Sequence, residues 1–235
     1  TFDWALERNF GTGFCDHRDD ELMLRCGASY FGQYLRDNPG ISAISSHHLC
    51  DTSAIEGIEV IPVYILRHPL ERILSVYDFE RKQDSSSPGA IAAKKYNFKD
   101  YVQWRMEPNV NGVIRNYQTI YLAGLQSTYK TNDCTADVFS VAMVKVQNSL
   151  VALVEQFDAS MIKFEAALKR RDMDIDLSYI KQNIGSERST ASGNAVSFIA
   201  EELGDIFKEV LSKNSYDLAL YCAVTQLLEK EQVNE

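Results

Sequence analysis

Residues 60–77 read VIPVYILRHPLERILSVY, and this stretch decides the class of fold. Residues 60–66 are almost entirely apolar and rich in β-branched side chains, which is typical of a strand covered on both faces of a parallel sheet. Pro62 has no backbone donor, so we expect it near the start of that strand. Pro69 suits the first turn of a helix. The apolar side chains that follow recur at three- and four-residue steps, which predicts a helix from Pro69 to Arg81.

The rest of the chain continues this alternation of strands and helices. We predict further strands at residues 41–46 and 150–154. Polar, glycine- or serine-rich segments at 84–89 and 183–194 predict loops. The predicted helices occupy residues 2–10, 19–36, 97–107, 112–124, 135–147, 157–171, 195–212 and 215–232. There is neither an internal repeat nor a domain linker, so the pattern predicts an α/β fold in a single domain over residues 1–235.

Composition narrows the classes of function. The chain has 235 residues, of which 45% are hydrophobic and 24% charged, as in ordinary globular proteins. No apolar run approaches the ~18 residues of a membrane span, so we expect no transmembrane segment. The formal charge of −9 argues against a broad nucleic-acid-binding surface. Residues 67–115 nevertheless hold nine Lys and Arg against six Asp and Glu, as either a local anion site or a solvated helix face would.

The cysteines and the N-terminus carry weaker signals. The five cysteines, Cys15, Cys26, Cys50, Cys134 and Cys222, are scattered without a CxxC pair, so we predict buried free thiols and no metal site. The chain has no Asn-X-Ser/Thr acceptor, which favours a bacterial cytoplasm over a Golgi lumen. It begins without Met in an amphipathic helix, so we expect an upstream segment that this sequence lacks.

The junction between the best strand and the next helix could bind an anion. Ligands of open α/β sheets bind beyond the carboxyl ends of strands, and the N-terminus of a helix attracts anions. Arg67 offers a bidentate fork for a phosphate. Ser75 lies about two helical turns further on, where its hydroxyl could reach the same phosphate. The alternative is an arginine that merely ends a strand and a serine that faces solvent.

Residues 61–83, IPVYILRHPLERILSVYDFERKQ, resemble the 3′-phosphate-binding motif of sulfotransferases that use 3′-phosphoadenylyl sulfate (PAPS). The likeness is greatest to the carbohydrate sulfotransferases of the heparan-sulfate 2-O and uronyl type and their bacterial relatives. This resemblance implies a P-loop-like parallel sheet flanked by helices, a helix-rich C-terminal half and a single sulfotransferase domain. Weaker similarities follow in the family's order at residues 44–49, 97–102, 115–124, 153–158, 183–188 and 214–221.

The resemblance implies transfer of a sulfuryl group from PAPS to an acceptor hydroxyl, with a carbohydrate as the favoured acceptor. A histidine would serve as general base. His47 is the candidate and His48 the alternative, because neighbouring residues of a strand point to opposite faces. His17 and His68 have less claim, and we expect His68 to help cap the helix that follows it.

The resemblance also implies the ligands of the nucleotide. Arg67 and Ser75 would bind the 3′-phosphate, which PAPS and its product PAP (adenosine 3′,5′-bisphosphate) carry and ATP lacks. Thr1 could donate its hydroxyl to the 5′-phosphosulfate, and Arg188 and Ser189 could close over the nucleotide. No metal is needed.

Four further residues receive expectations of their own. We expect Arg72 to pair with a carboxylate and Glu155 to be structural. We expect Tyr77 and Trp104 to belong to the core.

One departure from the family matters. The family's first strand and its phosphosulfate loop, of the form P-K-T-x-x-T-T/S, should precede the first helix, yet Thr1-Phe2 matches only the end of that loop. Without the loop lysine, we expect this chain to be a poor enzyme. Two alternatives stay open: another P-loop nucleotide transferase, such as a kinase, and a non-catalytic nucleotide- or glycan-binding domain. The sequence leaves the oligomeric state open.

Overall fold

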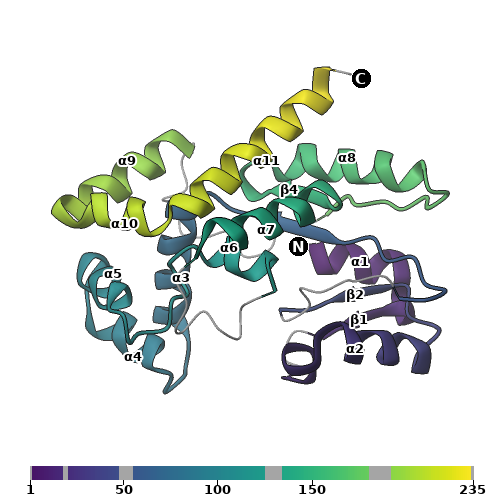
Figure 1. Cartoon of the computed structure of the whole chain (residues 1–235), viewed down its shortest axis with the longest axis horizontal. Helices are drawn as coiled ribbons and strands as arrows, with labels where there is room; N and C mark the ends of the chain where they lie inside the picture. Colours follow the sequence, from purple (N-terminus) through teal and green to yellow (C-terminus); the bar gives the residue numbers. More distant parts are fainter. Residues whose placement is uncertain (1, 18–20, 48–54, 125–133, 180–191, 234–235) are drawn as a thin grey trace. The chain divides into compact units, whose positions relative to one another are not determined.

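A computed structural model describes residues 2–17, 21–47, 55–124, 134–179 and 192–233 (Figure 1). The chain forms two compact units. Unit 1 comprises residues 1–64, 148–152 and 156–184, and unit 2 comprises residues 65–147, 153–155 and 185–235. The division passes through two strands, β3 (Val63–Leu66) and β4 (Leu150–Leu153). The single domain over residues 1–235 stays a prediction.

Unit 1 is built on a short parallel strand pair. β1 (Phe14–Asp16) pairs with β2 (Ala43–Ser45), with Phe14 opposite Ala43 and Asp16 opposite Ser45. The helices α1 (Phe2–Phe10) and α2 (Glu21–Asp37) lie on opposite sides of this pair (Figure 1). A third helix of this unit is α8 (Phe157–Lys169). The sequence did not predict β1, because three residues are too few to show a period of two.

The predicted helix at 19–36 is present but interrupted. Gly27 adopts φ 51° and ψ −132° inside α2, a left-handed conformation that glycine tolerates and that kinks the helix. A second glycine, Gly11, has φ 52° and follows α1, which ends at Phe10 as predicted.

β3 and β4 form a second two-stranded sheet. β3 begins at Val63 and is shorter than predicted, because Pro62 has no N–H to donate. Pro62 does accept a hydrogen bond through its carbonyl oxygen, from the Leu150 amide at 2.9 Å. Its predicted place at the start of the strand is thus confirmed.

Unit 2 is helical around a large apolar core. Its helices are α3 (Pro69–Lys82), α4 (Pro88–Lys95), α5 (Phe98–Met106), α6 (Tyr117–Leu122), α7 (Ala136–Gln147), α9 (Ser192–Leu203), α10 (Phe207–Lys213) and α11 (Ser215–Val233). Leu70, Ile73 and Tyr77 of α3 are buried in this core, and Trp104 packs against it. The predicted core roles of Tyr77 and Trp104 are confirmed.

The helices of unit 2 differ from the prediction in three places. The sequence did not predict α4, which starts inside the predicted loop at 84–89, where the Ser87 hydroxyl caps the Ala90 amide and Pro88 takes the first position. The predicted helix at 195–212 is two helices, since Gly204 has φ 54° within a 3₁₀ turn. The predicted helix at 112–124 is shortened to α6, because Asn116 is left-handed with φ 45°.

The cysteine prediction is half right. Cys15, Cys26, Cys134 and Cys222 are free thiols, as predicted. None of these four is buried: Cys26 and Cys222 are exposed, and the other two are half-buried. The fifth, Cys50, lies outside the described residues.

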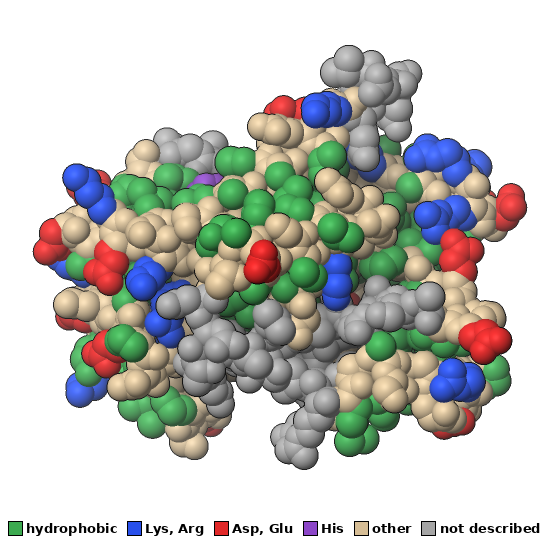
Figure 2. Space-filling view, viewed as in Figure 1, with side chains coloured by type: hydrophobic (Ala, Val, Ile, Leu, Met, Phe, Trp, Pro, Cys, Tyr) green, Lys and Arg blue, Asp and Glu red, His purple; other side chains and the backbone are tan. Residues whose placement is uncertain are grey.

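The fold is therefore mixed α/β and rich in helix, as predicted at that level. No described helix is both long enough and apolar enough to cross a membrane. On the face drawn in Figure 2, acidic and basic side chains lie interspersed among the described residues. The more specific P-loop-like arrangement stays a prediction.

Candidate functional site

The junction between β3 and α3 has the predicted form. β3 ends at Leu66, Arg67 and His68 connect, and α3 begins at Pro69 in its first turn. His68 occupies the N-cap position with φ −51° and ψ 126°. Its side chain makes no capping hydrogen bond, so the expectation that His68 caps the helix is wrong. An imidazole is a weaker cap than the short side chains of Ser, Thr, Asp or Asn.

Arg67 is held through its backbone. Its amide donates to Oε1 of Gln118 at 2.9 Å, and its carbonyl oxygen accepts from Nε2 of Gln118 at 2.9 Å. The side chain is half-buried and makes no hydrogen bond or ion pair with any residue of the described ranges. Arg67 therefore combines a fixed main chain with a guanidinium that is available to a ligand.

Ser75 lies on α3 in a position that could serve the same ligand. It follows Arg72 by one helical turn and so shares its face of the helix. From Pro69 to Ser75 the helix rises about 9 Å. The side chain is half-buried, and within the described part of the chain its hydroxyl has no hydrogen-bond partner.

Arg72 does not pair with a carboxylate as expected. It donates to the Val113 carbonyl oxygen and lies over the Tyr117 ring, with its guanidinium carbon 3.9 Å from the ring centroid. This is a cation–π contact, which a weakly hydrated guanidinium favours. Burial lowers the pKa of Arg72, and neighbouring Tyr117 and Asp217 oppose that shift. Arg72 thus fastens α3 to the segment before α6.

Glu155, His68 and Tyr221 form a cluster beside the junction. One carboxylate oxygen of Glu155 accepts from the His68 amide at 2.8 Å, and the other accepts from the Tyr221 hydroxyl at 3.2 Å. The rings of His68 and Tyr221 meet edge to face, with centroids 5.1 Å apart. The structural role predicted for Glu155 agrees with these contacts. They also place a negative charge at the N-terminus of α3, where it competes with an incoming anion.

Burial shifts the ionisation of this cluster. It lowers the pKa of His68, although Glu71 and Glu155 act in the opposite direction. Burial also raises the pKa of Tyr221, and the hydrogen bond to Glu155 adds to that shift. The Nδ1 atom of His68 is buried without a hydrogen-bond partner in the described structure. The neutral form of both side chains is therefore favoured.

Two weakly matching segments of the sequence meet in unit 2. The Asn116 side-chain oxygen accepts from the amides of Tyr216 and Asp217, at the start of α11. In return, the Asp217 carboxylate accepts from the amides of Gln118 (3.0 Å) and Thr119 (2.7 Å), at the start of α6. The N-termini of α6 and α11 therefore cap each other.

The sequence reasoning missed this network and the role of Gln118. Residues 115–124 and 214–221 resemble the sulfotransferase pattern as two separate segments, and the resemblance does not predict that they contact each other. One feature that they share is an Asn shortly before a helix start, at Asn116 and Asn214. Asn at such a position is an N-cap signal. Nothing in that signal says which helix it would cap.

The candidate base lies in unit 1. His47 follows β2 and is exposed. The His17 amide, directly after β1, donates to the Ser45 carbonyl oxygen at 2.6 Å. Since β1 and β2 are parallel, His17 and His47 lie at the same carboxyl edge of the pair. Four predicted site residues, Thr1, His48, Arg188 and Ser189, lie outside the described residues.

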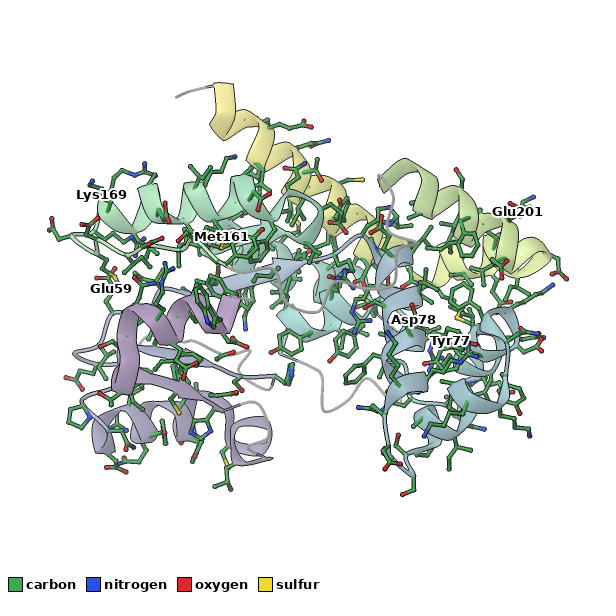
Figure 3. The ribbon with its side chains drawn as sticks, turned by 180° about the vertical axis from the view of Figure 1, so that it is seen from behind. Glu59, Tyr77, Asp78, Met161, Lys169 and Glu201 are labelled. Atoms are coloured by element: carbon green, nitrogen blue, oxygen red, sulfur yellow. The ribbon has the colours of Figure 1, made fainter. Side chains whose placement is uncertain are left out.

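The side chains of α3 lie on two faces of the helix. Tyr77, labelled in Figure 3, lies on the face that packs into the core, and its ring centroid is 5.0 Å from that of Tyr101 on α5. Arg72 and Ser75 share a different face of the helix. Within the described ranges, no group of three or more His, Cys, Asp or Glu side chains could hold a metal ion.

Comparison with known proteins found one similar protein. A protein of the archaeon Archaeoglobus fulgidus, called "Uncharacterized protein", is 28% identical over 232 residues. The alignment covers 96% of this chain and 90% of the relative. No family model matches the chain, and no solved structure matches it. The similarity thus extends along nearly the whole of both chains and names no activity.

Proposed function

We propose that this chain is a sulfotransferase that uses PAPS as the sulfuryl donor and an acceptor hydroxyl as the nucleophile. The observation that supports this most is the state of Arg67. Its main chain is fixed by Gln118 at the end of β3, while its guanidinium has no partner among the described residues. A guanidinium so placed suits a phosphate, which it can bind through two hydrogen bonds. The proposal includes the P-loop-like parallel sheet.

The proposed roles follow the 3′-phosphate. Arg67 would bind it with its guanidinium, and Ser75 would donate its hydroxyl from the second turn of α3. Because Gln118 accepts from the Arg67 amide and Glu155 accepts from the His68 amide, neither amide of the junction is free for the phosphate. Recognition of the 3′-phosphate would therefore depend on these two side chains more than on the helix N-terminus. Thr1, Arg188 and Ser189 are the further proposed ligands.

The proposed reaction is an in-line transfer. The acceptor oxygen attacks sulfur, the bond from sulfur to the 5′-phosphate oxygen breaks, and PAP leaves. The proton of the acceptor hydroxyl passes to an imidazole nitrogen of His47, or of His48 if that neighbour faces the acceptor. As in phosphoryl transfer, catalysis would come mainly from positioning and charge stabilisation.

A carbohydrate is the proposed acceptor. This part rests on the resemblance of residues 61–83 to carbohydrate sulfotransferases. The net charge of −9 suits a neutral or weakly charged glycan better than a highly sulfated one.

Thermal unfolding with PAP, AMP and ATP tests the nucleotide. A ligand at about 100 times its Kd adds ~2.7 kcal/mol of stability, so we expect a clear rise in Tm with PAP and much less with AMP. Arg67→Ala and Ser75→Ala should abolish most of the PAP effect. Arg81→Ala is the matched control, because it removes an exposed positive charge from the last turn of the same helix.

The same measurement separates the alternatives. Stabilisation by ATP in preference to PAP would contradict the proposal and favour a kinase-like enzyme. Equal losses of PAP and AMP binding in Arg67→Ala would contradict the assignment of the 3′-phosphate. Binding of PAP without any transfer to an acceptor would favour a non-catalytic domain.

Substitution of the histidines tests the base. We expect His47→Ala to lose transfer activity by at least about 100-fold, since general-base catalysis contributes this much. Its affinity for PAP should stay within about twofold, because a general base acts on the acceptor hydroxyl and not on the phosphates of the nucleotide. If His48→Ala loses activity and His47→Ala keeps it, His48 is the base.

A further inference from the structure

The side chain of Gln118 acts on Arg67 as a neighbouring strand would. It accepts from the Arg67 amide and donates to the Arg67 carbonyl, both at 2.9 Å. These paired bonds resemble those of a hydrogen-bonded pair in a sheet. Gln118 is only 7% exposed, so water does not readily replace them. The side-chain amide of Gln118 thus extends strand-like hydrogen bonding by one residue beyond Leu66, where β3 ends.

Gln118 is itself fixed by the mutual caps of α6 and α11. Its own amide donates to Asp217, whose carboxylate is 2% exposed and also accepts from Thr119. A buried carboxylate with several amide donors holds its position strongly. Asp217 of α11 therefore holds Gln118 in place, and Gln118 in turn holds the main chain of Arg67.

We infer that Gln118 is a positioning residue that directs the Arg67 guanidinium toward the 3′-phosphate and so sets preference for PAP over AMP. This inference rests on the proposed function. The rotamers open to a side chain depend on the backbone dihedrals of the same residue. With both backbone groups of Arg67 bonded, the direction in which its side chain leaves the main chain is restricted before the ligand arrives. Such preorganisation lowers the entropy lost on binding.

The Glu155 carboxylate makes correct placement of the Arg67 guanidinium more important. It accepts from the His68 amide at 2.8 Å, so the next main-chain donor after Arg67 is already engaged. A phosphate at this junction would then find a carboxylate beside it. Only a correctly directed guanidinium would offset that repulsion. A displaced one would lose the 3′-phosphate while leaving contacts to the rest of the nucleotide intact.

Isothermal titration with PAP and with AMP tests this inference on the longest chain that folds. Gln118→Met keeps the length of the side chain and removes both hydrogen bonds. We expect the ratio of the AMP Kd to the PAP Kd to fall about tenfold or more. Gln118→Glu still accepts from the Arg67 amide but cannot donate to its carbonyl, so it should give an intermediate ratio. It also serves if Gln118→Met does not fold.

Tyr77→Phe is the control for a loss of structure alone. Tyr77 is buried in the core of the same unit and donates its hydroxyl to the Tyr96 carbonyl oxygen at 2.9 Å, outside the hydrogen bonds that link Asp217, Gln118 and Arg67. We expect its Kd ratio to match the wild type. An unchanged ratio in Gln118→Met, or an equal fall in Tyr77→Phe, would overturn the inference and leave the proposed function standing. A wild-type protein that binds PAP no better than AMP would instead contradict the proposed function.

Discussion

His68 shows how burial controls a single titratable residue at the junction. Its imidazole is half-buried against Tyr221, and it lies close to the carboxylates of Glu71 and Glu155. Burial opposes the charged form more than the two carboxylates favour it, so the pKa of His68 is lowered. The folded protein therefore binds a proton at this site less readily than the unfolded chain does.

We expect His68 to make the protein less stable in mild acid. Below the ordinary histidine pKa of about 6.5, the unfolded chain takes up a proton that the folded protein still excludes. Stability from His68 is thus present at neutral pH and lost as the pH falls through that window, by at most ~1.4 kcal/mol per pH unit. Urea unfolding at pH 8 and pH 5 measures it.

His68→Gln isolates this effect, because the other titrating groups stay unchanged and cancel in the comparison. Between pH 8 and pH 5, its free energy of unfolding should fall less than that of the wild type. Parallel pH profiles for the two proteins would show that His68 carries a normal pKa.

Among single residues, the sequence predicted those that carry a motif and missed those that support it. Arg67 and Ser75 could be chosen because strand, arginine, proline and helix follow one another along the chain. Gln118 could not, because it binds this junction from 51 positions away. Glu155 was expected to be structural, but nothing local shows that its partner is the His68 amide, 87 positions away.

At the scale of elements, α3, α4 and α5 meet around a buried ion pair. Arg105 of α5 bonds to Glu80 of α3 at 2.5 Å, and the two side chains are 5% and 14% exposed. Tyr101 donates to the same carboxylate, and its hydroxyl accepts from Arg105. Gly89 of α4 covers this group, so closely that an added Cβ would lie under 3.0 Å from both ionic side chains.

We expect Gly89→Ala to destabilise the protein by about 1–3 kcal/mol, the usual cost of overpacking. Alanine is the better helix former by about 1 kcal/mol, so the loss would come from displacement of the ion pair. Urea unfolding measures it. Gly40→Ala is the control, because an added Cβ there meets nothing within 4 Å. If Gly89→Ala loses no more stability than Gly40→Ala, the packing argument is contradicted.

Element types were easier to predict than their ends. Periodicity found α3 and α11 because their apolar faces are long enough to read. α4 was missed because Ser87-Pro88-Gly89 is equally typical of a loop and of a capped helix start. α6 was predicted too long because its start depends on Asp217, a partner 98 positions away at Thr119.

At the scale of the whole molecule, the chain passes from one unit to the other within two strands. β3 gives Val63 and Tyr64 to unit 1 and its last two residues to unit 2, and the division of β4 falls after Ala152. The sequence predicted one domain because no linker interrupts it. Because the chain changes unit inside strands, no separate linker marks the division.

We therefore expect the two units to unfold together. Each holds one of the two tryptophans, Trp4 in α1 and Trp104 in α5. Trp104→Phe leaves fluorescence that reports on unit 1, and Trp4→Phe leaves fluorescence that reports on unit 2. If β3 and β4 couple the units, both signals should change at the same urea concentration as the far-ultraviolet circular dichroism, as in a two-state transition. Separate midpoints, reproduced in the wild type by circular dichroism, would show two domains that fold independently.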